Sequence, residues 1–267
     1  MDVAVNAVAE SERRREATGR RAAATWLTYI LLAAGAALFA LPFLWMVSIS
    51  LRPPAEVAAP GLHLIPGKIV WSNYTRALTI MPFHLYLLNT LKVTLLAVVG
   101  TALSSSIAAF AFARLRAPGR ETLFIVMLAT IMLPAEVTMI PRFVIFLIRQ
   151  FFLTIPSDLE DAAKIDGCSP FRIYWQVFMP LSKPVLVTVA VFAFVAYWND
   201  FMTPLIYLNS VEKRTLALGL ATFQDVWGVD IVSLMAASTA VLIPVLVIFF
   251  LAQRYFVQGV VMTGLKG

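Results

Sequence analysis

The stretch Leu87–Phe112, LLNTLKVTLLAVVGTALSSSIAAFAF, contains a single charged side chain, Lys92. As a helix rising about 1.5 Å per residue it extends about 39 Å, more than the hydrocarbon core of a bilayer, which is about 30 Å thick. A segment in lipid must satisfy its backbone hydrogen bonds internally, which a helix does. The stretch therefore predicts an all-α membrane protein.

The composition of the whole chain agrees with this class. Of its 267 residues, 60% are hydrophobic and 13% are charged, whereas ordinary soluble domains are about a quarter charged. Further apolar segments predict a polytopic helix bundle with five clear spans. Besides Leu87–Phe112, these spans are Thr25–Ser48, Leu123–Ile140, Val185–Leu208 and Val232–Gln253.

Basic residues form short clusters between the apolar segments, an arrangement that orients membrane proteins and does not indicate nucleic-acid binding. The net charge is +6. The arginines within Arg13–Arg21 predict a cytoplasmic tail, residues 1–22, ahead of a transmembrane domain, residues 23–267. The apolar run after the tail is too long for a signal-peptide core, so it is predicted to be a retained span.

The remaining clusters predict which loops lie inside and outside. Arg114, Arg116 and Arg120 place the end of the second span inside, so the loop Leu51–Phe83 is predicted to lie outside. The charged loop Ser157–Pro180 is predicted to lie inside. Only Arg142–Pro156 is available to cross back to it, and fifteen helical residues extend about 22 Å. Either an unusually short element crosses the bilayer, or the chain lacks part of a helix.

Local signals in Ser157–Pro180 predict two short helices joined by a sharp turn. Ser157 and Glu160 fit a capping box, in which each side chain accepts from the other residue's backbone N–H. Gly167 is suited to the left-handed position that ends a helix near Asp166. Ser169, followed by proline, is typical of the start of a second helix. On these residues alone, a docking surface and an ordinary amphipathic loop on the membrane are equally good interpretations.

The spacing within this loop resembles a known pattern. Asp161-Ala-Ala-Lys-Ile-Asp-Gly167, nine residues, then Val177-Phe-Met-Pro180 resembles the loop of permease subunits of binding-protein-dependent ABC importers. The family pattern is Glu-Ala-Ala, three residues, Gly, nine residues, Ile-x-Leu-Pro, and three positions depart from it conservatively. Other segments resemble the carbohydrate branch, of the maltose-permease second-subunit type, over about Trp26 to Gly267. They are Asn89–Thr94, Ala111–Arg120, Trp198–Phe201 and Arg254–Gly267.

The resemblance implies that residues 157–180 couple the membrane domain to a cytoplasmic ATPase dimer, which would hold ATP and Mg. It implies two further partners, a second homologous permease subunit and an extracytoplasmic solute-binding protein, in a bacterial inner membrane. The binding protein is expected to meet the loops Leu51–Phe83 and Gln224–Asp230. The coupling residues carried over are Glu160, Asp161, Ala162, Ala163, Asp166, Gly167 and Pro180.

The chain departs from the family in one place. Family members have a further span between the equivalents of Pro141 and Phe146, and this chain joins those positions almost directly. A deletion of about one helix is therefore expected, and a transport-impaired copy is an alternative to a working permease.

Candidate residues of the substrate path are Tyr197, Asn199 and Asp200, which are predicted near the middle of the span Val185–Leu208. A carboxylate inside a membrane is costly and faces a cavity or a partner. Lining of a sugar path is one interpretation, and an interhelical hydrogen bond between two permease subunits is the other.

Catalytic and metal-binding patterns are missing from the sequence. His63 and His84 lie far apart, and the only cysteine, Cys168, is predicted on the other side of the membrane, so no metal site is expected. No G-x-x-x-x-G-K-[ST] loop is present, which assigns ATP hydrolysis to a separate subunit and predicts that this chain binds no cofactor and is not an enzyme.

Three functions remain open from the sequence. The first is a sugar importer, and the second is the same machine for a polyol, a glycerophosphodiester or an aminosugar. The third class, a membrane-bound enzyme or a secondary transporter, would show paired intramembrane carboxylates, several intramembrane ionisable residues or an internal repeat.

Overall fold

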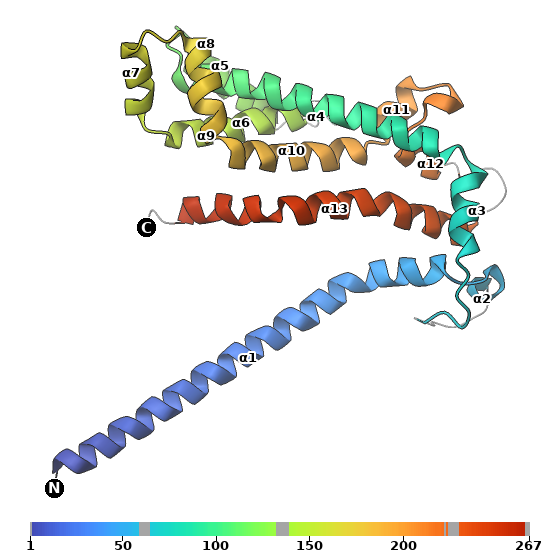
Figure 1. Ribbon diagram of the computed structural model, residues 1–267, viewed down its shortest axis with the longest axis horizontal. Coiled ribbons are helices and arrows are strands. Elements are labelled where there is room, and N and C mark those ends of the chain that lie inside the picture. The colour runs from blue at the N-terminus through green and yellow to red at the C-terminus, as the bar shows by residue number, and fades with distance from the viewer. Residues whose placement is uncertain (1, 59–64, 132–138, 222, 224–229, 265–267) are drawn as a thin grey trace.

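The computed structural model describes the backbone of residues 2–58, 65–131, 139–221, 223 and 230–264 (Figure 1). Side chains are described for residues 24–57, 65–130, 141–221, 223 and 230–253. Within these ranges the regular elements are all helical and none is a strand, which confirms the all-α prediction.

Three helices are long and apolar enough to cross a membrane. They are α1 (Asp2–Ser50), through its segment Ala24–Ser50, α4 (Phe83–Arg114) and α13 (Ile231–Gly264). These helices contain three of the predicted spans. A fourth candidate is bent, because the helical segment Pro170–Leu181 meets α10 (Lys183–Trp198) at an angle of 80°. By length and composition the described chain thus offers three or four crossings.

The predicted span Leu123–Ile140 covers most of one helix and the first two residues of another. Helix α5 (Arg120–Ile131) has 12 residues and α6 (Met139–Thr154) has 16, while residues 132–138 lie outside the described chain. Helices of these lengths extend about 18 and 24 Å, so neither reaches across a hydrocarbon core of about 30 Å. The described residues therefore confirm the all-α membrane bundle, and the count of five clear spans stays a prediction.

The predicted span Val185–Leu208 is wrong at its C-terminal end. Helix α10 ends at Trp198, and a separate short helix, α11 (Met202–Tyr207), follows. The Asn199 amide donates to the carbonyl of Val195 at 2.8 Å. A carboxylate oxygen of Asp200 accepts from the backbone N–H of Thr203 at 3.1 Å. Side chains that bond the nearby backbone favour helix ends over helix interiors, so this pair interrupts the helix that apolar periodicity alone would continue.

The bundle is built around α4. Helices α6 and α10 both pack along α4, α13 packs against α10, and α1 contacts α13 and then diverges towards its N-terminus (Figure 1). Many large apolar side chains on α1 are exposed, including Leu31, Leu38 and Phe39. Such a surface is stable in lipid or against another membrane helix.

Short helices gather at the end of the bundle where α1 ends and α4 begins. They are α2 (Pro54–Ala58), α3 (Ser72–Ile80), α12 (Leu216–Ala221) and the 3₁₀ turn Val211–Lys213. The buried Asn73 amide donates to the carbonyls of Ser50 and Arg52 at 3.0 and 2.8 Å. The hydroxyls of Ser50 and Tyr74 are 2.8 Å apart. The described parts of the predicted outside loop Leu51–Phe83 are thus ordered by contacts to α1.

Asp230 ties α3 to the start of α13 at this same end. It accepts from the backbone N–H and the hydroxyl of Ser233, at 3.1 and 2.7 Å, and pairs with Arg76 at 3.1 Å. Partial burial alone would raise the pKa of the Asp230 carboxyl, but the bonds from Ser233 and the charge of Arg76 outweigh it and lower the pKa. The residues 224–229, predicted to meet a binding protein, lie outside the described chain.

We expect Asp230→Asn to remove an acid-sensitive part of the stability. Because folding lowers this pKa, the stabilisation is present above the unfolded value of about 3.9 and is lost as the pH falls through the folded value. Asparagine caps a helix about as well as aspartate, so the variant can keep the bond from the Ser233 N–H and loses only the part that depends on charge. Thermal unfolding of the purified protein between pH 3 and pH 7 should show a smaller acid-induced loss of Tm for the variant. Equal losses for variant and wild type would contradict this account.

Candidate coupling site

Helix α7 (Ser157–Ile165) projects from the end of the bundle opposite α2 and α3 (Figure 1). It closes in the predicted turn, with Gly167 in the left-handed region at φ +76°. The N–H of Cys168 donates to the carbonyl of Ala163 at 2.9 Å, and that of Gly167 to Lys164 at 3.0 Å. These two bonds define a Schellman motif, which fixes the direction of the chain after the helix.

A second helical segment starts as predicted. Ser169 caps α8 (Pro170–Ile173), with its hydroxyl accepting from the N–H of Arg172 at 3.4 Å. The segment then widens into a π-helical turn, Tyr174–Phe178, which the sequence did not predict, before α9 (Met179–Leu181). Pro180 follows this turn, and a proline ring needs room at the carbonyl four residues earlier. Wider π turns are frequent at functional sites.

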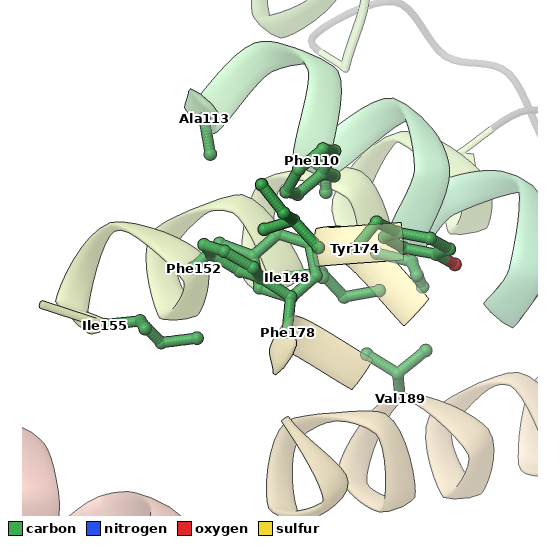
Figure 2. Packing of buried hydrophobic residues seen from close by; sticks show 11 residues of the cluster. Phe110, Ala113, Ile148, Phe152, Ile155, Tyr174, Phe178 and Val189 are labelled. Atoms are coloured by element: carbon green, nitrogen blue, oxygen red, sulfur yellow. The ribbon is translucent and has the colours of Figure 1, made fainter. Parts of the chain in front are cut away.

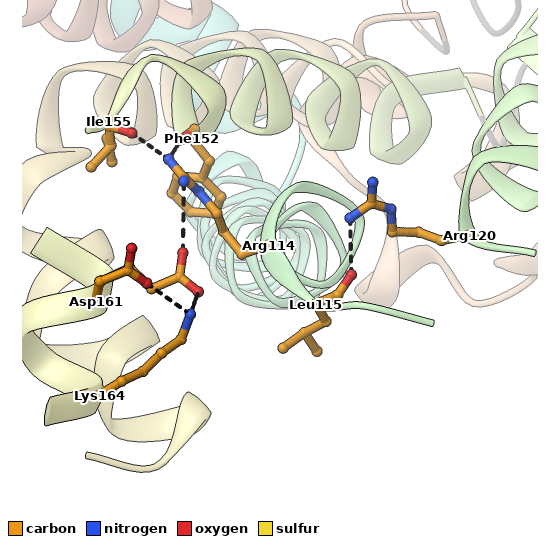
Figure 3. A network of polar contacts seen from close by, with 8 residues as sticks. Arg114, Leu115, Arg120, Phe152, Ile155, Asp161 and Lys164 are labelled. Carbon is orange, nitrogen blue, oxygen red and sulfur yellow. Dashed lines mark hydrogen bonds and ion pairs between the residues drawn. The ribbon is translucent and has the colours of Figure 1, made fainter. Parts of the chain in front are cut away.

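The predicted capping box is wrong. The residue before α7 is Pro156, and no side chain caps the helix. Glu160 is instead turned towards the bundle, where only 8% of its surface is exposed. Its carboxylate lies 3.6 Å from the Arg114 guanidinium and 2.8 Å from the Lys164 ammonium (Figure 3). A carboxylate held by two cations is not available to bond the first turn of its own helix.

Arg114, the last residue of α4, joins four elements at this end. Besides Glu160 of α7, its guanidinium donates to the carbonyls of Phe152, at 2.7 Å, and Ile155 (Figure 3). It also lies 5.1 Å from the centre of the Phe178 ring, in the π turn. A single largely buried cation thereby bonds the end of α6, faces the π turn and holds α7. The sequence marked Arg114 only as an orienting charge, because nothing local shows that α6 and α7 end beside it.

An aromatic cluster lies next to Arg114, on the side towards the interior of the bundle. Phe110 of α4, Phe152 of α6 and Phe178 meet edge to face, with ring centres 5.0 Å apart for Phe110 and Phe178 and 5.3 Å for Phe152 and Phe178 (Figure 2). Tyr174 joins them, and its hydroxyl lies 2.7 Å from that of Ser106. Close-packed interiors transmit displacement because they are hard to compress.

The remaining coupling residues face outward. The Asp161 side chain is 65% exposed, and its carboxylate lies 3.3 Å from the Lys164 ammonium. The hydrogen bond that Lys164 donates to Glu160, opposed by desolvation and aided by Asp161, raises the pKa of Lys164 above its ordinary value. Ala162 and Asp166 are exposed and Ala163 is half-buried. Ile165 is 87% exposed and Phe171 is exposed too, so α7 and its turn present apolar and acidic groups together.

The candidate substrate-path residues lie elsewhere, near the C-terminal end of α10. The hydroxyl of Tyr197 is 2.9 Å from that of Thr101 on α4. Asn199 and Asp200 hold the break after α10, and so do not lie mid-span as predicted. The next residue back, Trp198, is buried and donates from its indole to the carbonyl of Val241 on α13.

Comparison with known proteins identifies the family. Residues 17–262 match the family described as binding-protein-dependent transport system inner membrane component. The chain belongs to this family. The resemblance seen in Asp161–Pro180 is thus confirmed, and the chain is a transport permease component and not a catalytic enzyme.

Two relatives and one solved structure illustrate the similarity. The arabinooligosaccharides transport system permease protein AraQ of Halalkalibacterium halodurans is 30% identical, over 91% of this chain and 97% of the relative. The sn-glycerol-3-phosphate transport system permease protein UgpE of Yersinia pestis is 30% identical, over 87% and 94%. A bacterial ABC transporter involved in the import of the acidic polysaccharide alginate has a similar fold. Its matching chain has a TM-score of 0.76 and 24% identity, covering 86% of this permease and 95% of that chain.

The alignments also show that the matched part of this permease has fewer residues than the matched part of its relatives. The AraQ alignment has 270 positions but covers 91% of 267 residues, which is about 243, so about 27 positions of AraQ have no counterpart here. The UgpE alignment has 266 positions and covers 87%, about 232 residues, which leaves about 34. In each case the unmatched positions together exceed the about 20 residues that one membrane span needs.

Proposed function

We propose that this permease is the membrane-embedded subunit of an ATP-driven sugar importer and that α7 is the element on which a cytoplasmic ATPase subunit docks. The observation that carries the proposal is the division of α7 into two faces. Glu160 is bound inward to Arg114, while Asp161, Ala162 and Ile165 face outward with no element of the described chain covering them. A helix held rigidly on one side and uncovered on the other is suited to transmit the movement of a docked partner.

The proposed mechanism is alternating access driven from outside the membrane. Closure of an ATPase dimer on ATP displaces α7. The Arg114 bonds carry that displacement to α4 and α6, and the π turn carries it through the 80° bend into α10. The packed rings of Phe110, Phe152 and Phe178 make the elements move together. ATP and Mg belong to the partner, and this chain supplies the rigid connection.

The assembly we infer contains a second permease subunit, two ATPase subunits and an extracytoplasmic binding protein. The family description places the chain in an inner membrane. We assign the N-terminus and α7 to the cytoplasm, because the tail carries Arg13–Arg21 and positive loops stay inside. Helices α2, α3 and α12 then face the binding protein.

A carbohydrate is the proposed solute. AraQ is named for arabinooligosaccharides and the solved relative imports alginate, while UgpE is named for sn-glycerol-3-phosphate, which keeps a non-sugar solute as the second candidate. Tyr197, Asn199 and Asp200 remain proposed path residues. Their described partners are within the chain, so a contact to solute requires them to exchange these hydrogen bonds.

Asp161→Lys is the direct test of docking. We expect the affinity for the ATPase subunit to fall by about thirtyfold, since a charged group that loses a buried partner costs about 2 kcal/mol or more. Co-purification and quantitative binding to the ATPase subunit measure it. Glu212→Lys, a matched reversal on the exposed turn at the opposite end, should leave binding unchanged. Unchanged binding by the Asp161 variant would count against docking at α7.

A further inference from the structure

The loop between α4 and α5 forms an open pocket on the surface of the bundle. The pocket has a volume of about 520 Å³ and is lined by residues 116–122. Bonds within the chain fix its shape. The Arg120 guanidinium donates to the carbonyl of Leu115 at 2.9 Å (Figure 3), and the N–H of Leu123 donates to the carbonyl of Gly119 at 2.9 Å. The pocket is therefore built by the chain itself.

Positive charge exceeds negative charge around this pocket. Arg116 and Arg120 line it together with one carboxylate, that of Glu121. One oxygen of Glu121 pairs with Arg120, and the other lies 3.6 Å from the guanidinium of the buried Arg149 on α6. Three guanidinium groups in the pocket or bonded to it thus share one carboxylate. The exposed Arg116 takes no part in these pairs, so it can bind an anion without breaking them.

An apolar surface begins directly beside the pocket. Leu123, Ile125 and Val126 of α5 are each more than half exposed. They follow Arg120 by three to six residues, which is about 5–9 Å along a helix. Exposed apolar patches of this kind mark contacts with a membrane or with another protein. Because arginines lie at one end of this patch, the pocket is placed where the headgroups of a bilayer meet its hydrocarbon.

We propose that this pocket binds the phosphate of an anionic phospholipid whose acyl chains lie along the exposed face of α5. A guanidinium suits phosphate because its planar donors bond two oxygens at once. Basic pockets near membrane helices on the cytoplasmic side bind such headgroups. A free phosphate would use the arginines but not the apolar face, and a lipid without net charge would gain little from the arginines. The leaflet rests on the proposed function, which assigns this end to the cytoplasm, whereas the binding itself does not.

Native mass spectrometry of the purified whole permease tests the binding and needs no partner subunit. The protein in detergent is given equal amounts of phosphatidylglycerol and phosphatidylcholine. We expect the wild type to retain phosphatidylglycerol preferentially, and Arg116→Gln to reduce that preference about fivefold, the effect of one basic residue near an anionic surface. Lys213→Gln removes one charge from the exposed turn at the opposite end and should leave the preference unchanged. A reduction by Arg116→Gln no larger than that by Lys213→Gln would overturn the proposal.

Two further measurements separate the lipid from other occupants of the pocket. A large excess of inorganic phosphate should leave the retained phosphatidylglycerol in place, and its displacement would show a site for a free anion. Arg116→Gln should also bind the ATPase subunit as the wild type does. Loss of that binding together with unchanged lipid retention would show that the ATPase subunit, and not a lipid, covers the pocket.

A labelling experiment in intact cells tests the leaflet separately. Cys168 is the only native cysteine, so Cys168→Ser gives a background in which Pro118→Cys places one thiol in the pocket. We expect this thiol to react with an impermeant maleimide only after the cells are permeabilised. Reaction from outside would refute the cytoplasmic assignment of this end, and with it the docking of a cytoplasmic ATPase on α7. The lipid preference measured in detergent would decide the binding site independently.

Discussion

Replacing Gly167 by proline will abolish both association with the ATPase subunit and ATP-driven transport. Proline fixes φ near −65°, whereas Gly167 requires +76°, and the substitution also removes the N–H that donates to Lys164. The Schellman turn then cannot form, and α7 loses its fixed direction relative to α8. Co-purification with the ATPase subunit and uptake in the reconstituted transporter measure the two losses.

Graded variants at two glycines show whether docking or strain is responsible. Gly167→Asn should retain association, because asparagine tolerates the left-handed region, and Gly167→Ala should lose part of it. Gly119 is the matched control: its φ is +77°, and a Cβ at either glycine would meet nothing within 4 Å. Gly119→Ala should lower stability by a similar amount, about 1 kcal/mol, without weakening association. Equal effects on association at the two positions would refute a special role for the turn after α7.

Arg114→Ala will produce the largest loss of stability and will uncouple ATP hydrolysis from transport. It leaves the largely buried Glu160 carboxylate without its inward partner and frees the carbonyls of Phe152 and Ile155. Breaking a buried pair by removing one member costs about 3–5 kcal/mol. Differential scanning fluorimetry should show the loss. Transport should fall further than ATP hydrolysis. Asp161 on α7 can still dock the ATPase subunit, but the link through which α7 moves α4 is lost.

Controls for Arg114 are available at the same end. Arg120 pairs with the exposed Glu121, and Arg120→Ala should change stability by less than about 1 kcal/mol, as exposed pairs do. Combining Arg114→Ala with Glu160→Ala should cost less than the two single changes together, since residues in contact are not additive. Additive losses would show that the two side chains act independently and would remove the proposed link.

Short-range signals predicted the coupling segment well. The turn at Gly167 and the cap at Ser169 depend on neighbours within four residues, and both are where the sequence placed them. The π turn and the inward orientation of Glu160 were missed, because they depend on Arg114 and Phe110, which are distant in sequence. The capping box failed for the same reason: a distant cation competes for a carboxylate that would otherwise cap its helix.

Apolar length predicted the long helices and failed where polar side chains interrupt them. Asn199 and Asp200 bond the local backbone and end α10, although the residues around them are apolar. Between Leu123 and Pro156, apolar length predicted one full span, Leu123–Ile140, followed by a segment too short to cross the bilayer. The antiparallel contacts of Arg142 and Arg149 show α5 and α6 as a pair, and hydropathy contains no information on which segments pair.

Site-specific photo-cross-linking from Ile165 tests the central claim most directly and needs no knowledge of the solute. Ile165 is 87% exposed at the end of α7, so a benzoylphenylalanine there should not disturb the fold. In membranes that contain the ATPase subunit, the account predicts a covalent product with that subunit, whereas a probe at Ile206, exposed on α11 at the opposite end, should give none. A probe at Ile165 that gives no product with the ATPase subunit in an assembled, transporting complex would contradict it.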